Sequence, residues 1–163
     1  MSTTAAKAKK APTDFRTANV QLEVKIDAPA QRVWDAMVKE TTHWWRKDFL
    51  TKESKGFYIE PRIGGKMYED RGDGNGLIWA EVIGVDAPNS IQMLGILSAE
   101  YGGPAHTIMK FAVEAAGENA SIVKITDTIW GNLSESAGST MHEGWTILFQ
   151  QSLKEYVESG KRA

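Results

Sequence analysis

Two acidic side chains are the best candidates for acid–base chemistry in this sequence, because each shares a strand face with apolar residues. Asp127 continues the alternation of Ile125 and Ile129, and Glu69 lies two positions after Met67. An unpaired carboxylate on a buried face is costly, so each needs a partner, a raised pKa or access to a polar part of a cavity. A strand end or a β-bulge would also relieve that cost, and this alternative stays open.

Three histidines are available to complete such a site. His43 precedes a pair of tryptophans near a helix end, and we expect it near the mouth of a cavity. We expect His106 to face outward, because it has the opposite strand phase to Met109, and His142 to lie at the rim on the first turn of the last helix. A solvated or locally hydrogen-bonded imidazole is the alternative for each. The candidate catalytic residues are therefore Glu69, Asp127 and His43.

The stretch EDRGDGNG, residues 69–76, resembles both a calcium loop and an adhesion tripeptide. In the calcium-loop register, Arg71 and Val82 occupy the first and last ligand positions, which need oxygen ligands. The Arg-Gly-Asp tripeptide acts as an adhesion signal only outside the cell, and nothing else in the sequence indicates export. The alternating glycines with Asp73 and Asn75 instead predict a hairpin turn between two strands.

Composition and charge exclude several classes of protein. A chain of 163 residues with 42% apolar and 25% charged residues is typical of one soluble globular domain. Its net charge of −2 gives no general attraction for nucleic acid or anionic lipid. The absence of cysteine, of metal-site spacing and of a GxSxG or P-loop motif predicts no metal or cofactor. Without a membrane span or secretory signal, we expect a cytoplasmic protein.

Hydrophobic periodicity predicts the element order β-α-β5-β-α, an α+β fold with a short second helix after the first. Apolar alternation begins at Val20, helical spacing follows, five short strands occupy the glycine-rich middle, and another strand precedes a long helix that starts at Thr140. We expect a disordered basic leader over residues 1–17, a single domain over residues 18–160 and a tail over residues 161–163.

The long amphipathic helix is the available cover for the apolar face of the predicted curved sheet. Space would remain between them, and several large, adaptable side chains are expected to face it. Simple core packing is the alternative for each, but together they predict a ligand-binding cavity. These residues are Trp45, Met67, Trp79, Met93, Met109, Phe111, Trp130, Trp145 and Phe149.

Four stretches, in this order and spacing, resemble the START-like superfamily, also called SRPBCC or birch-pollen-allergen-like. They are VKIDAPAQRVWDAM, EPRIGGKMYED, GLIWAEVIGVDAPNSIQML and EGWTILFQQSLKEYV, and the similarity runs from about Val20 to Val157. Within the superfamily they are most similar to bacterial proteins grouped with the activator of the heat-shock chaperone ATPase and with polyketide cyclase-like proteins. The resemblance implies a helix-grip fold, in which a seven-stranded antiparallel sheet grips a long C-terminal helix around an apolar cavity.

The resemblance carries few residue roles. Gly64 and Gly65 match the family's glycine pair before a strand, Met67 stands where a bulkier aromatic is common, and Trp145 heads the gripping helix. Family members mostly bind apolar or amphipathic small molecules, including lipids, while some catalyse cyclisation, dehydration or hydrolysis and some bind a chaperone.

Binding of an apolar small molecule is the favoured function, because the sequence offers cavity-type residues and no complete catalytic constellation. A hydrolase, cyclase or dehydratase that uses the same cavity is one alternative. The other is an interaction protein that stimulates a heat-shock chaperone ATPase, a partner that the residues themselves do not indicate. Whether the protein is an enzyme, which ligand it takes and its oligomeric state stay open.

Overall fold

The alternating segment that ends at Ile26 forms the first strand of an antiparallel sheet. In a computed structural model that describes residues 12–163, β1 spans Asp14–Ile26 and pairs along its whole length with β7 (Ser121–Leu133). The strand begins six residues before Val20, because those residues pair with β7. They are mostly exposed and show no apolar alternation, so the sequence pattern does not indicate them. The predicted leader therefore overlaps β1 over residues 14–17, and its residues 1–11 lie outside the described residues.

Seven strands form one antiparallel sheet in the order β1-β7-β6-β5-β4-β3-β2. Apart from β1 beside β7, each strand pairs with its neighbour in the sequence. This confirms the predicted meander. The other strands are β2 (Gly56–Ile59), β3 (Lys66–Gly72), β4 (Asn75–Asp86), β5 (Ser90–Leu97) and β6 (Ala105–Ala115).

A long C-terminal helix crosses the concave side of the sheet. It runs through α3 (Ala137–Trp145), a π-helical stretch (Thr146–Leu153) and α4 (Lys154–Ser159), and the residues at both junctions keep helical dihedral angles. The helix begins before Thr140 and ends at Ser159, and the following residue, Gly160, has a φ of 76° that is favourable for glycine.

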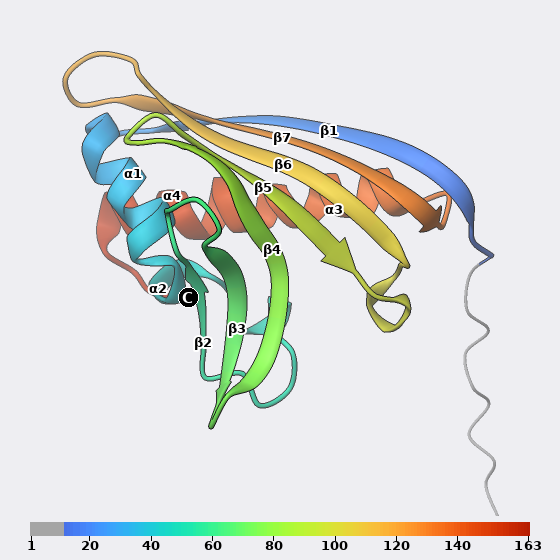
Figure 1. Ribbon diagram of the computed structural model, residues 1–163. Helices are drawn as coiled ribbons and strands as arrows, with labels where there is room; N and C mark the ends of the chain where they lie inside the picture. The colour runs from blue at the N-terminus through green and yellow to red at the C-terminus, as the bar shows by residue number, and fades with distance from the viewer. Residues whose placement is uncertain (1–11) are drawn as a thin grey trace, which may run out of the picture.

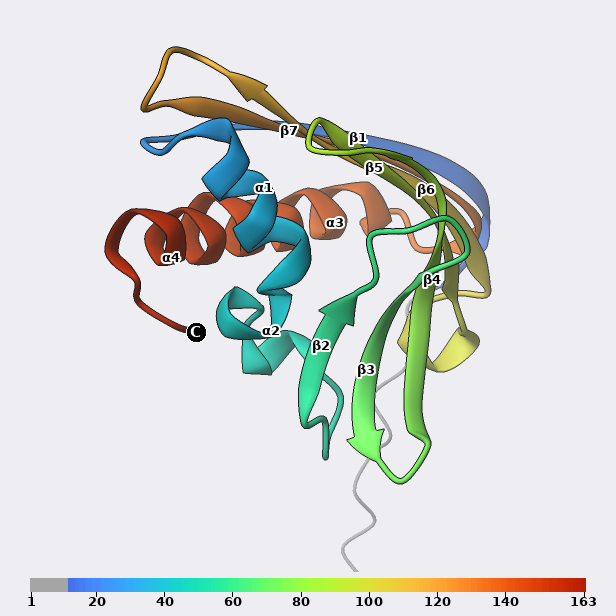
Figure 2. The same ribbon diagram turned by 60° about the vertical axis from the view of Figure 1, so that its left-hand side comes forward.

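The shorter helices close one end of the molecule. They are α1 (Ala30–Lys39) and α2 (Thr41–Trp44), the predicted short second helix, followed by a 3₁₀ turn at Lys47–Phe49. A second 3₁₀ turn, Ala99–Tyr101, follows β5. The C-terminal helix runs beneath β1, β7 and β6 (Figure 1). In the turned view, α1 crosses the C-terminal helix and α2 lies beside β2 (Figure 2). This arrangement is the predicted helix-grip fold.

The stretch EDRGDGNG forms the β3–β4 hairpin, as its turn residues predict. Asp73 and Gly74 between the strands have φ values of 55° and 78°, which suits a type I′ turn. The Arg71 side chain donates to Thr51 Oγ1 from its Nε at 3.1 Å. The tripeptide is therefore part of a turn, and its arginine is engaged within the domain.

A β-bulge in β4 decides where Trp79 points. Met67 pairs with Ala80 but the next residue, Tyr68, pairs with Ile78, so Trp79 is an extra residue in β4. A bulge bends its strand and re-aims a side chain. Because of it, Trp79 and Ala80 both lie on the inner side, although regular alternation would place them on opposite faces.

Candidate functional site

A cavity of about 410 Å³ lies between the inner face of the sheet and the first half of the C-terminal helix. Its walls come from β2 to β7, from the residue after α2, from the first half of the C-terminal helix and from both 3₁₀ turns. Most of the lining is apolar, and six aromatic rings contribute to it: Trp45, Phe49, Phe57, Trp79, Tyr101 and Trp145. A pocket of this size with few polar groups is typical of a small-molecule site.

Five of these six rings contact another ring of the set, and these contacts support the shape of the cavity. Trp45 stacks on Phe57 with ring centroids 4.0 Å apart, and it meets the edge of Trp145 at 6.2 Å. Tyr101 packs edge-on against Trp79 at 5.1 Å. Such stacked and edge-to-face pairs are favourable beyond the area that they bury. These contacts hold the rings in fixed orientations around the cavity.

Asp127 is the carboxylate in the cavity wall. It is 2% exposed on the inner face of β7, as its strand phase predicts. Thr107 Oγ1 donates to Asp127 Oδ1, and Trp145 Nε1 donates to Asp127 Oδ2 at 2.9 Å. Burial raises the pKa of Asp127 above its usual 3.8, while the two hydrogen bonds act in the opposite direction. Asp127 is therefore an acid held by two neutral donors.

Glu69 is also buried, at 1% exposure, but it lies behind the cavity wall. Trp79 Nε1 donates to Glu69 Oε1 at 3.0 Å. Thr51 donates to Glu69 Oε2 from its backbone nitrogen at 3.0 Å and from its hydroxyl at 2.6 Å. These bonds occupy the carboxylate, so its structural role is to hold Trp79 and the loop at Thr51.

His43 belongs to a cluster outside the cavity. Its Nδ1 lies 3.0 Å from Tyr156 Oη, and Tyr156 donates to Glu40 Oε2 at 2.5 Å. Arg32 donates to both Glu40 oxygens, at 2.8 and 3.1 Å, and this contact holds the pKa of Glu40 below its usual 4.5. The cluster joins α1 and α2 to α4, and the cavity does not include His43.

The other histidines also lie outside the cavity. His106 faces outward on β6, as its phase predicts, and its ring centroid lies 6.0 Å from that of Trp130. His142 is exposed on α3, next to Met141, which lines the cavity. Within residues 12–163, therefore, no histidine lies beside Asp127 in the cavity wall.

The predicted cavity residues fall into three groups: residues that line the cavity, residues buried in the adjoining core, and Trp130. Trp45, Met67, Trp79, Met109 and Trp145 line the cavity. Met93, Phe111 and Phe149 are fully buried in the adjoining core instead, and the Phe111 and Phe149 ring centroids are 4.9 Å apart.

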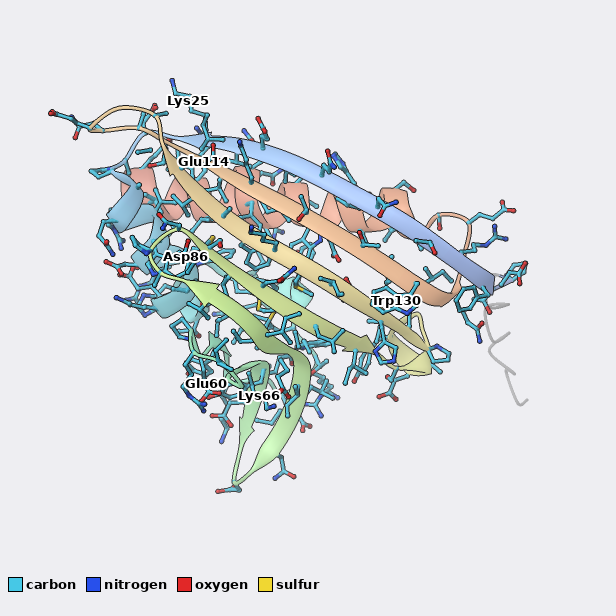
Figure 3. All side chains as sticks on the ribbon, turned by 45° about the horizontal axis from the view of Figure 1, so that its top comes forward. Lys25, Glu60, Lys66, Asp86, Glu114 and Trp130 are labelled. Carbon is cyan, nitrogen blue, oxygen red and sulfur yellow. The ribbon has the colours of Figure 1, made fainter. Side chains whose placement is uncertain are left out.

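The prediction that Trp130 lines the cavity is wrong, because Trp130 lies on the outer face of the sheet (Figure 3). It has the opposite strand phase to Asp127 and Ile129, which point inward, and it pairs with the outward-facing His106. The alternation of β7 contains this information, since Trp130 directly follows the inward-facing Ile129.

Several lining residues escape prediction from the sequence. Tyr101 and Phe49 come from 3₁₀ turns, which carry no periodic signal, and Leu97 lies at the end of β5. Phe57 alternates with Tyr58 within GFYIE, so strand phase was the available signal for it.

Within residues 12–163, no group of three or more histidine, aspartate or glutamate side chains has a geometry that could hold a metal ion. Over the same residues, no helix combines the length and the apolar character needed to cross a membrane.

A family profile described as "Activator of Hsp90 ATPase homolog 1-like protein" matches residues 27–158. A comparison with curated proteins finds no match.

Solved structures show the same fold at low sequence identity. DynU16, from the dynemicin biosynthetic locus, is 19% identical with a TM-score of 0.64, over 88% of this chain and 48% of that one. This chain thus spans about half the length of DynU16. CalU16 from Micromonospora echinospora is 14% identical with a TM-score of 0.60, covering 93% and 86% of the two chains. Norcoclaurine synthase from Thalictrum flavum, in complex with dopamine and hydroxybenzaldehyde, is 13% identical with a TM-score of 0.57, covering 91% of each.

Proposed function

The chain belongs to the family of Activator of Hsp90 ATPase homolog 1-like proteins, and we propose that it binds an apolar or amphipathic small molecule between its curved sheet and C-terminal helix. One observation carries this proposal, the cavity of about 410 Å³ with largely apolar walls. Transfer of an apolar ligand from water into such a space gains roughly 25 cal/mol for each Å² that is buried.

The polar groups of the cavity support an amphipathic ligand. Asp127 and Thr107 lie on adjacent strands of the inner face, and both line the cavity among apolar neighbours. A few fixed polar groups in an apolar pocket orient a ligand and give specificity. The buried carboxylate and the hydroxyl would therefore fix one end of the ligand, while the aromatic walls hold the rest.

Two measurements test this function. Native mass spectrometry of the protein purified from its own host should show a retained small molecule. Titration with phenylnaphthylamine, a neutral apolar fluorophore, should saturate at one probe per chain and release any retained ligand. A protein with no retained molecule and no saturable probe binding would refute the proposal.

Acid–base catalysis in the same cavity is a second candidate, which the burial of Asp127 favours. A carboxyl group with a raised pKa can act as a general acid or base closer to neutral pH than an exposed aspartate. As a hydrolase, cyclase or dehydratase, the protein would lose turnover in Asp127→Asn but retain phenylnaphthylamine binding. Unchanged turnover of a cavity-bound substrate in that variant would exclude Asp127 as the catalytic group.

Stimulation of a heat-shock chaperone ATPase rests on the family description. Measuring the ATPase rate of the purified chaperone with and without this protein tests it, and an unchanged rate would exclude it. We also propose a cytoplasmic location, which the absence of cysteine supports.

A further inference from the structure

The charged side chain in the cavity wall is acidic. Among the residues of 12–163 that line the cavity, Asp127 is the one carboxylate, and none is lysine, arginine or histidine. Burying a carboxylate costs its hydration, and hydrogen bonds, an opposite charge or a raised pKa must offset that cost. The cavity therefore presents a negative group that has no positive partner in its own walls.

Both hydrogen bonds to Asp127 come from neutral groups, the Thr107 hydroxyl and the Trp145 indole. They supply one donor to each carboxylate oxygen, and an ionised carboxylate has about four acceptor positions. Acceptor capacity is therefore left over. Burial is the largest cause of the raised pKa of Asp127, and no cation acts against it. A positively charged ligand group would supply the missing compensation.

The surrounding rings favour the same kind of ligand group. The Trp145 indole that donates to Asp127 also meets Trp45 edge-on, and both rings line the cavity. The faces of tryptophan rings attract cations, most strongly where water is excluded. An alkylammonium group beside Asp127 would thus find a carboxylate and aromatic rings together, and its apolar body would fill the rest of the space.

Building on the proposed function, we propose that the ligand is an amphipathic amine whose protonated nitrogen pairs with Asp127 while its aromatic or aliphatic body occupies the apolar cavity. Asp127 is then the residue that sets specificity for a cation over a neutral or anionic molecule of the same shape. A neutral hydroxyl group would satisfy an acceptor position but not the charge, so the same body carrying an alcohol should bind more weakly.

A matched ligand pair tests this inference on the unmodified protein. Naphthylethylammonium and naphthylethanol share one apolar body and differ in the head group. Isothermal titration near neutral pH should show the amine binding about tenfold more tightly than the alcohol, as expected for a charge-assisted hydrogen bond after partial desolvation of the ammonium. Naphthylacetate, the anionic counterpart, should bind most weakly of the three.

Two variants locate the effect. Asp127→Asn removes the charge but can still accept from Trp145 and donate to Thr107, so the fold should survive and the amine-to-alcohol ratio should fall to about one. Glu114→Gln removes one negative charge from the outer face of β6, where Glu114 pairs with Lys124 at 2.8 Å (Figure 3). This matched control should keep the wild-type ratio.

The outcomes separate the inference from the function on which it rests. Equal affinity of amine and alcohol in the wild-type protein, or an unchanged ratio in Asp127→Asn, would overturn the amine assignment and leave small-molecule binding intact. Failure of both naphthyl compounds while phenylnaphthylamine still binds would overturn it as well. Failure of all probes would refute the proposed function itself.

Discussion

Replacing Gly144 should separate the stability of this protein from its capacity to bind a ligand. Gly144 lies inside α3 and lines the cavity, and a Cβ atom built there would meet Phe49 Cε1 at 3.4 Å, at the near edge of ordinary contact. Glycine inside a helix costs roughly 1 kcal/mol relative to alanine. Gly144→Ala should therefore raise the free energy of unfolding by about 0.5–1 kcal/mol, with a small loss of affinity.

Gly144→Leu extends the test because its larger side chain must enter the cavity. Burial of a leucine side chain gains roughly 1.5–3 kcal/mol, and overpacking against Phe49 would cost about 1–3 kcal/mol. These two effects nearly cancel, which leaves the roughly 1 kcal/mol gained by removing a glycine from the helix, so the variant should be at least as stable as the wild type. A bound ligand would compete with the new side chain, and we expect affinity for phenylnaphthylamine to fall at least about tenfold.

The assay combines urea unfolding, followed by circular dichroism, with a fluorescence titration of each variant. Gly138→Ala is the matched control, because Gly138 lies in the same helix outside the cavity, where a Cβ would meet Ala18 Cβ at 3.2 Å. It should leave probe affinity unchanged. Folded Gly144→Leu protein that binds the probe as tightly as the wild type would show that binding occurs elsewhere.

Three further predictions concern the buried and clustered polar groups. Burial raises the folded-state pKa of Asp127 above 3.8. The unfavourable contribution of this carboxyl group to the free energy of unfolding is therefore absent below that pH and grows as pH rises toward the folded value. Urea unfolding should thus show Asp127→Asn gaining stability relative to wild type between acidic and neutral pH, and a pH-independent difference would contradict this. Trp145→Phe removes a donor from the Asp127 carboxylate, so it should cost about 2 kcal/mol and raise the Asp127 pKa further in a carboxyl NMR titration; a lowered pKa would count against the assignment. Tyr156→Phe removes a hydrogen bond to Glu40 and should cost about 1 kcal/mol in urea unfolding. The folded-state pKa of Glu40 is lowered from 4.5, so the stability that its hydrogen bonds contribute is present above this pH and is lost as pH falls through the folded value. If Tyr156→Phe lost the same amount of stability at acidic and at neutral pH, that result would argue against the cluster.

The order of elements follows from the sequence because strand and helix periods differ. The inward residues Val20, Val24 and Ile26 are all buried, as their alternation predicts. The start of β1 does not follow, because Phe15 is 70% exposed and contributes pairing rather than burial. Edge pairing of this kind depends on the partner strand, which local periodicity does not describe.

The cavity is only partly predictable, because phase gives the face of a strand but not the position of the empty space along it. Met93 and Met109 are paired on adjacent strands and both point inward, yet only Met109 lines the cavity. Trp79 lines the cavity as predicted, but the bulge that places both Trp79 and Ala80 on the inner side is a feature that strict alternation does not describe. Tyr101 arrives from a 3₁₀ turn between strands, where local sequence carries no signal for a distant wall.

The methionine methyl groups offer the most direct test of the central claim, that a ligand binds between the sheet and the C-terminal helix. Met67, Met109 and Met141 line the cavity, while Met37 and Met93 are buried outside it. With isotope-labelled methionine methyl groups, NMR should show contacts from bound naphthylethylammonium to the three cavity methyls and none to the other two. Saturable binding of that amine without contacts to Met67, Met109 or Met141 would contradict the account.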